Sequence, residues 1–436
     1  MSKVASTGPS RRATWAWALW DWAEQPYPTM IQTFIFATYI TSSAFGNKDT
    51  NTSVLSIGSI LASVLVAVSA PIFGRRSDDS GRRKFWLLAN SGVLIAIMAL
   101  SYFVFPDPAF LLFGVVLYAV GSVVQETAFI NYYAMLKQVT TKDNIGKVSG
   151  LAWGLGYVGG IILLLVSLVG FVLPDQPWFG VSTDQAENIR VLFLFSAVWM
   201  LIFTIPLAIF VPEVKARSTA AKETILQSYQ ALWQQLKGLA KHSPDTLRFL
   251  IASAVYRDGL AGVFMYGAIL GSVAFGFSTT QVIFYGIAAN IVAGLGAALG
   301  GWLDSRIGTK TNIVASLTGL LLAGLGVFAF AGAGKITYWI GGLILCLFVG
   351  PAQASSRTFV ARFTPEGREG EIFGIYQTTG KITSFLSPTF WLISTGIATA
   401  AGVAHSAIFG ILGLMVVLGA GLWLLLRVHP NPVMAE

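Results

Sequence analysis

Long apolar runs bounded by charged residues, glycine and proline repeat along the whole chain. Most have about 20 residues or more, the length at which an α-helix crosses the hydrocarbon core of a bilayer. Twelve such spans are predicted, at residues 14–43, 53–73, 84–105, 109–136, 147–173, 188–211, 247–275, 279–303, 311–331, 336–360, 370–398 and 403–426. The pattern predicts an all-α integral membrane protein with twelve transmembrane helices.

The composition agrees with this pattern and excludes an ordinary soluble protein. Of 436 residues, 55% are hydrophobic and 11% are charged. The stretch Met1–Arg12 is short, polar and basic, and the apolar run after it is too long for a cleavable signal, so we expect the first helix to be retained. Cys346 is the single cysteine, which excludes an intrachain disulfide and a multi-cysteine metal site. We expect no metal and no other cofactor.

The basic residues are distributed unevenly between the predicted loops. With the N-terminus in the cytoplasm, 23 of the 28 lysines and arginines fall in cytoplasmic segments. This asymmetry explains the net charge of +8 without nucleic acid as a partner. We expect a multi-pass protein of the plasma membrane of a prokaryote, in contact with the lipid bilayer and with both termini in the cytoplasm.

The longest internal loop divides the chain into two sets of six spans. We predict an N-terminal bundle at 1–211, a cytoplasmic linker at 212–246 and a C-terminal bundle at 247–436. Apolar residues recur in the linker at helical spacing, which predicts an amphipathic helix on the membrane surface. They are Ile225, Tyr229, Leu232, Leu236 and Leu239.

The two halves carry an internal repeat. Gly74, Asp78 and Lys84 recur 226 residues later as Gly300, Asp304 and Lys310. Two pseudo-symmetric six-helix bundles with a site between them form a transporter architecture.

The loop from Gly74 to Lys84 resembles the signature loop of the major facilitator superfamily, with matches at Gly74, Asp78, Gly81 and the two arginines that follow. The resemblance implies that Asp78 and Arg82 lock the cytoplasmic helix ends in the outward-open state. Asp304 and Arg306 form a weaker copy of this conformational lock in the second half.

Three further stretches, at 17–26, 249–259 and 373–388, resemble the "unknown major facilitator" family, which includes fungal vacuolar amino-acid effluxers. The resemblance implies transport of an amino acid, in the direction of export. Where that family has an Asn-Ser pair, this chain has Glu24-Gln25.

Six ionisable residues fall inside the predicted spans, at similar distances from their cytoplasmic ends. At 1.5 Å per residue they lie roughly 13 to 18 Å deep, near the middle of the bilayer. They are Asp21, Glu24, Glu126, Arg257, Asp258 and Lys381. Charges at this depth are costly, so they predict a polar layer inside the protein.

Four carboxylates and two bases make up this layer, so at least one carboxylate is expected to lack a full partner and to suit proton coupling. The candidates are Glu126 first, then Glu24 and Asp21. Arg257 and Lys381, facing Asp21 and Asp258, would bind the two ends of a zwitterion. The further candidates for substrate binding are Trp20, Glu24, Gln32, Gln353, Tyr376 and Gln377. An alternative is that the basic residues only neutralise the acidic ones and hold helices in register.

These observations predict a secondary transporter, monomeric, that moves a small zwitterion such as an amino acid by alternating access with protons. An exporter of amphipathic drugs or lipid-like molecules is the alternative within the class. A membrane-bound transferase is disfavoured because the three histidines lie in loops or the tail and no catalytic dyad is evident at depth. We therefore do not expect an enzyme.

Overall fold

The computed structural model describes residues 10–213, 227, 230, 233–234, 237–238, 241, 244–277, 279–403 and 405–429. Every regular element in these residues is helical. The apolar positions of the predicted linker helix lie outside the described residues.

The described chain forms two compact units. One comprises residues 1–141 and 155–219, the other residues 142–154 and 220–436. The predicted boundaries at 211 and 246 stay predictions.

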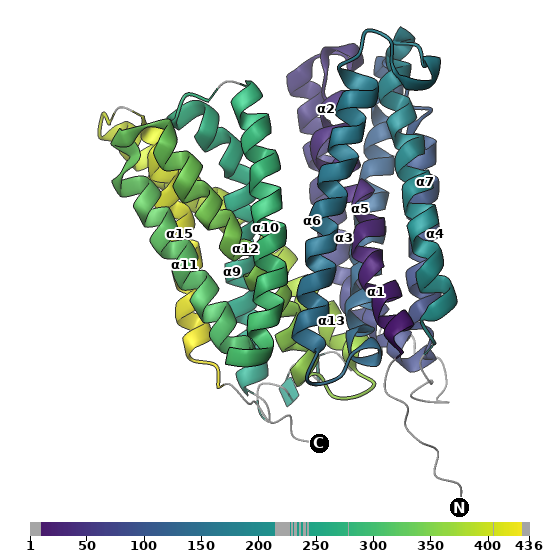
Figure 1. The fold of residues 1–436 in the computed structure, drawn as a ribbon, viewed down its shortest axis with the longest axis vertical. Coiled ribbons are helices and arrows are strands. Elements are labelled where there is room, and N and C mark those ends of the chain that lie inside the picture. Colours follow the sequence, from purple (N-terminus) through teal and green to yellow (C-terminus); the bar gives the residue numbers. More distant parts are fainter. Residues whose placement is uncertain are drawn as a thin grey trace, which may run out of the picture. The chain divides into compact units, whose positions relative to one another are not determined.

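The first half of the described chain, whose α-helices Figure 1 labels, contains six long helices and three shorter α- or π-helical segments. They are α1 (Arg11–Glu24), η1 (Tyr27–Phe34), α2 (Phe36–Ile40), α3 (Lys48–Ser80), α4 (Arg83–Ser101), α5 (Leu111–Ala134), α6 (Ile145–Ser167), η5 (Leu168–Val172) and α7 (Glu187–Phe210). In its core, Met30 of η1 packs with Leu163 of α6, Phe171 of η5 and Leu192 of α7. The first predicted span is therefore a broken helix.

The second half contains a corresponding set of helices. They are α9 (Pro244–Ile269), η8 (Leu270–Ala274), α10 (Thr279–Ile307), α11 (Thr309–Ala329), α12 (Lys335–Phe363), α13 (Glu369–Thr383), α14 (Leu386–Ala400) and α15 (Gly410–Leu426). Helix α9 packs closely on α15, where a Cβ atom at Gly421 would lie 2.5 Å from that of Tyr256. The eleventh predicted span is divided between α13 and α14.

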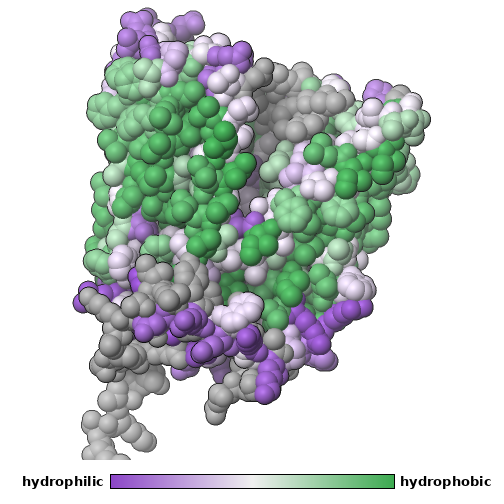
Figure 2. All heavy atoms as spheres, turned by 180° about the vertical axis from the view of Figure 1, so that it is seen from behind, coloured by the Kyte–Doolittle hydropathy of each residue, from purple (hydrophilic) through white to green (hydrophobic). Residues whose placement is uncertain are grey.

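Nine helices in the described residues are long and apolar enough to cross a membrane. Three helical regions are not among these nine: α1 to α2, α9, and α13 to α14. They carry five of the six predicted intramembrane charges, Asp21, Glu24, Arg257, Asp258 and Lys381. Hydrophobic side chains cover the middle of the visible faces, and hydrophilic ones gather toward the ends (Figure 2). This distribution is that of a membrane protein, in which lipid replaces water around the middle of each helix.

Candidate functional site

Tryptophan packing positions helix α1. Its N-terminus is capped by Ser10, whose hydroxyl accepts the N–H of Ala13. The indole N–H of Trp17 donates to the carbonyl of Tyr132 at 2.9 Å, and that of Trp20 donates to Ser91 Oγ at 3.1 Å. Both side chains are fully buried, Trp17 against Tyr132 of α5 and Trp20 against Ser91 of α4 and Tyr132, and these contacts hold α1 in place. Trp20 thus serves packing in this structure.

Glu24 is the most buried carboxylate of the predicted layer, at 2% exposure. Its Oε2 accepts the amide N–H of Gln125 on α5 at 3.0 Å, and its Oε1 accepts that of Gln25 at 3.2 Å. Asp21 lies one helical turn earlier on α1, and Glu126 follows Gln125 on α5, so both are acidic neighbours of Glu24. The structure therefore brings three predicted proton-coupling residues together within one unit, with Glu24 at the centre and neutral amides as its hydrogen-bond donors.

The break in the first span follows directly after Glu24. Helix α1 ends there, and Pro26 leads into the π-helical turn η1. Thr29 donates its hydroxyl to Gln25 Oε1 at 3.3 Å, which continues the hydrogen-bonded chain away from Glu24. Further along, Gln32 donates to Ser122 Oγ on α5 at 3.1 Å. Irregular backbone with polar side chains at this depth is typical of helices that line a polar region.

Arg257 is the centre of the second group, in the other unit. Its Nη2 donates to Gln377 Oε1 at 2.8 Å and its Nη1 donates to the carbonyl of Tyr376 at 3.1 Å. Its Cζ lies 3.8 Å from the centroid of the Tyr376 ring, as a cation–π contact requires. The structure thus brings together three of the predicted substrate-binding residues.

Asp258 is adjacent to Arg257 in sequence but has other partners. Its carboxylate accepts the backbone N–H of Ser387 at 2.6 Å, and the Ser387 hydroxyl donates to its carbonyl at 2.9 Å. Ser387 is in the first turn of α14, so Asp258 caps that helix. Lys381 on α13 and Gln353 on α12 are half-buried.

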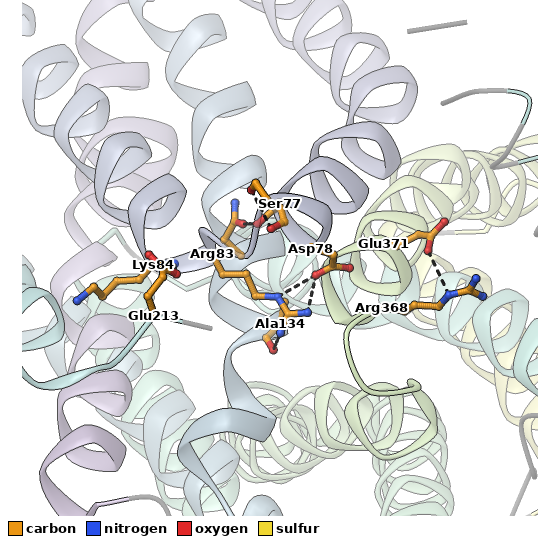
Figure 3. Close-up of polar contacts among 10 residues, drawn as sticks. Ser77, Asp78, Arg83, Lys84, Ala134, Glu213, Arg368 and Glu371 are labelled. Carbon is orange, nitrogen blue, oxygen red and sulfur yellow. Dashed lines mark hydrogen bonds and ion pairs between the residues drawn. The ribbon is translucent and has the colours of Figure 1, made fainter. Parts of the chain in front are cut away.

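The signature loop forms an ion pair between Asp78 and Arg83 (Figure 3). The Nε of Arg83 donates to Asp78 Oδ1 at 2.8 Å, and its Nη1 donates to the carbonyl of Ala134. Arg82, which the resemblance pairs with Asp78, is exposed. Gly81 has φ of 61°, a left-handed conformation that explains a glycine there, and Gly74 is buried within α3.

The second copy of the loop also has a different arginine as the partner of its aspartate. Asp304 accepts from Arg362 Nη2 at 3.1 Å and from the Thr309 hydroxyl at 3.1 Å. Arg306 is exposed and stacks on Trp302, with Cζ 3.9 Å from the ring centroid. Sequence reasoning did not assign roles to Arg83 and Arg362, because only packing shows which basic side chain points to an aspartate.

Buried Arg357 on α12 was also missed. Its Nε donates to Ser149 Oγ at 2.9 Å and its Nη2 donates to the Ser149 carbonyl at 2.6 Å. Ser149 in turn donates to the carbonyl of Ala354. The sequence contains one indication of this residue, because Arg357 belongs to a predicted cytoplasmic group of basic residues.

Asp245, at the start of α9 and outside the membrane-spanning segments, has a shifted pKa. Partial burial acts to raise the pKa of Asp245, but hydrogen bonds from His429 and Arg248 outweigh this and hold it below its ordinary value. The contact with His429 Nδ1 is 2.7 Å long and attaches the end of the described chain to the first turn of α9.

The comparison with known families agrees with this architecture. The family described as "Vacuole effluxer Atg22 like" matches residues 137–431, more than half of the chain. The chain belongs to this family. The predicted resemblance is thereby confirmed, and the relatives place this Atg22-like chain among transporters of the major facilitator superfamily.

An "Uncharacterized MFS-type transporter YxiO" of Bacillus subtilis is 27% identical to this family member over 410 residues, which is 92% of each chain. "Autophagy-related protein 22-1" of Neosartorya fischeri is 25% identical over 271 residues. That alignment covers 56% of this chain and 42% of the fungal protein.

Solved structures of the superfamily share the fold. The proton:xylose symporter XylE bound to 6-bromo-6-deoxy-D-glucose matches with a TM-score of 0.71 at 13% identity, covering 96% of this chain and 95% of its own. The human organic anion transporter MFSD10 (TETRAN) matches with a TM-score of 0.71 at 17% identity, covering 96% of this chain and 100% of its own. The predicted twelve-helix major-facilitator fold is confirmed, and the chain is a multi-pass membrane protein.

Proposed function

We propose that this transporter exports a small zwitterion, such as an amino acid, and that it is driven by protons through alternating access. The observation that carries the proposal is the environment of Glu24, a buried carboxylate whose described hydrogen bonds come from two glutamine side chains. An amide donates to a charged carboxylate and also accepts from a neutral one, so the same side chains accommodate both protonation states. A coupling group needs this property.

The proposed substrate class and the proposed direction of transport are supported by other observations. The family description as a vacuole effluxer supports export. Mixed charges support a zwitterion, because one unit holds the basic Arg257 and the other holds acidic residues around Glu24. The bacterial relative and the excess of basic residues in the predicted cytoplasmic segments support the plasma membrane with both termini inside.

Transport by purified protein in liposomes tests the coupling. Vesicles loaded with a metabolite mixture are given a pH gradient, and the released solutes are identified by mass spectrometry. We expect gradient-dependent release by the wild type and none by Glu24→Gln, which keeps the shape of the side chain but cannot change its protonation. Glu366→Gln, at an exposed carboxylate, is the matched control and should behave as the wild type.

The same assay compares the three acidic residues Glu24, Glu126 and Asp21. Glu126→Gln and Asp21→Asn are expected to reduce the response to the gradient less than Glu24→Gln, because both side chains are less buried than that of Glu24. Gradient-driven release that is unchanged in Glu24→Gln would refute the assignment of Glu24.

A further inference from the structure

Arg257 has hydrogen-bond donors that no acceptor in the described residues takes up. A guanidinium carries five N–H donors, and two of them bond to Gln377 and to the carbonyl of Tyr376. Five less two leaves three, one each on Nε, Nη1 and Nη2, and within the described part of the chain these three have no acceptor. A half-buried cation in a helix of a membrane bundle is costly unless an anion completes its coordination.

Among the described residues, the partners of Arg257 are all neutral. Its described contacts are an amide oxygen, a backbone carbonyl and an aromatic ring, and none of them is a carboxylate. The acidic residue next to it, Asp258, is used by the backbone N–H of Ser387 at 2.6 Å. Successive helical residues point about 100° apart, so Asp258 faces α14 while Arg257 faces α13.

Helix α13 holds the guanidinium in a fixed position. Tyr376 lies against it at 3.8 Å from ring centroid to Cζ, and Gln377 binds Nη2. Gly380 is one helical turn beyond Tyr376, on the same face of α13. A Cβ atom at Gly380 would lie 3.3 Å from Nη1, 3.6 Å from Cζ and 3.7 Å from Nη2. Any side chain there would press on the guanidinium and occupy space beside its free donors.

We propose that Arg257 and Gly380 form a carboxylate-binding site of this transporter, with Gly380 as the residue that determines specificity by leaving the guanidinium open. The ligand is a small planar carboxylate, which takes two parallel N–H bonds from the arginine fork. This inference rests on the proposed transport of a small solute. It predicts that the carboxylate group, rather than the cationic end, is required at Arg257.

Paired ligands that differ only in this group provide the test. The purified full-length chain is screened by thermal shift and then by calorimetry against the amino acids, simple monocarboxylic acids, and the carboxamide of each. We expect at least one acid to bind while its carboxamide does not. Arg257→Gln should weaken that binding about tenfold to a hundredfold, the value of a hydrogen bond to a charged group. Arg257→Lys should retain part of it.

Two further variants separate a binding role from a structural one. Gly380→Ala should weaken binding of the acid with little change in the melting temperature of the free protein, because the guanidinium moves while the helix is kept. Arg248→Gln removes an exposed arginine from the same helix α9 and should bind the acid as the wild type does.

Several outcomes would overturn the inference: equal binding of acid and carboxamide, full binding by Arg257→Gln, or no acid bound by the wild type. If Arg257→Gln fails to fold, the acid and carboxamide pair on the wild type still decides. A transported solute without a carboxylate would refute the carboxylate site while transport stands. If the wild type transports a carboxylate in liposomes without any effect of the pH gradient, only the proposed proton coupling is refuted.

Discussion

At the scale of single residues, the buried carboxylates of Glu24 and Asp258 differ in their hydrogen-bond donors, and this difference suits them to different roles. Asp258 accepts a backbone N–H in the first turn of α14 and so caps that helix. Glu24 accepts from the side chains of Gln125 and Gln25, which also tolerate a neutral carboxyl group. Asp258 is therefore suited to a structural role and Glu24 to a change of protonation.

The capping role of Asp258 predicts the effect of substitution there. Asp258→Ala removes the acceptor and should lower the stability of the folded protein by about 1 to 2 kcal/mol, the usual cost of losing a cap. Asp258→Asn keeps an acceptor oxygen and should cost less. Denaturant unfolding in detergent measures both. A stable Asp258→Ala protein with impaired ligand binding would instead place Asp258 in the substrate site.

At the scale of elements, the broken helices coincide with the charged residues. The first span breaks between α1 and η1 beside Glu24, and the eleventh between α13 and α14 close to Lys381. Neither region meets the length and hydropathy of an uninterrupted membrane helix. The polar residues that weaken the hydrophobic signal are among those we propose for transport. An intramembrane charge needs protein partners that a straight lipid-facing helix does not offer.

A reciprocal cap joins the ends of two other helices. Glu213, just beyond α7, accepts the backbone N–H of Lys84 at 2.8 Å and that of Phe85 at 3.0 Å, at the start of α4 (Figure 3). Lys84 Nζ donates in turn to the carbonyl of Ala208 near the end of α7 at 3.2 Å. Arg82, at the position before α4, forms no side-chain cap of its own. Glu213 thus takes over the capping of the helix that begins with Arg83.

Glu213→Ala should expose these N–H groups and cost about 1 kcal/mol of stability. It should also speed hydrogen exchange at 84–86, measured by mass spectrometry, because the first turn of α4 would fray. Glu366→Ala is the control, since that carboxylate is exposed and lies in another loop. Equal exchange in the two variants would show that water replaces the cap without loss.

At the scale of the whole molecule, the distribution of charge predicts how the chain is inserted. Of the 28 lysines and arginines, 23 fall in segments predicted to be cytoplasmic. Retention of basic loops on the cytoplasmic side determines the orientation of a multi-pass protein.

Cysteine labelling in intact cells tests this orientation. The single native cysteine, Cys346, is buried and is replaced by alanine as background. Phe179→Cys, at a position that is 91% exposed between α6 and α7, should react with an impermeant maleimide from outside. Glu366→Cys should react only after permeabilisation. The reverse pattern would show the opposite insertion.

The sequence by itself determined the twelve-helix fold class, the family and which ionisable residues fall inside the predicted spans. Hydropathy and charge act over whole segments and depend little on the exact packing, because the bilayer imposes one length and one polarity on every span. For this reason Asp21, Glu24 and Arg257 were recognised as unusual without coordinates.

Only the tertiary structure decided which side chain each charge meets. Arg82 and Arg83 are neighbours in sequence, yet Arg83 reaches Asp78 while Arg82 is exposed. Arg257 and Asp258 likewise point to different helices. Adjacent helical residues differ by about 100° in direction, so their partners depend on how the neighbouring helices pack, over distances in sequence that no local pattern encodes.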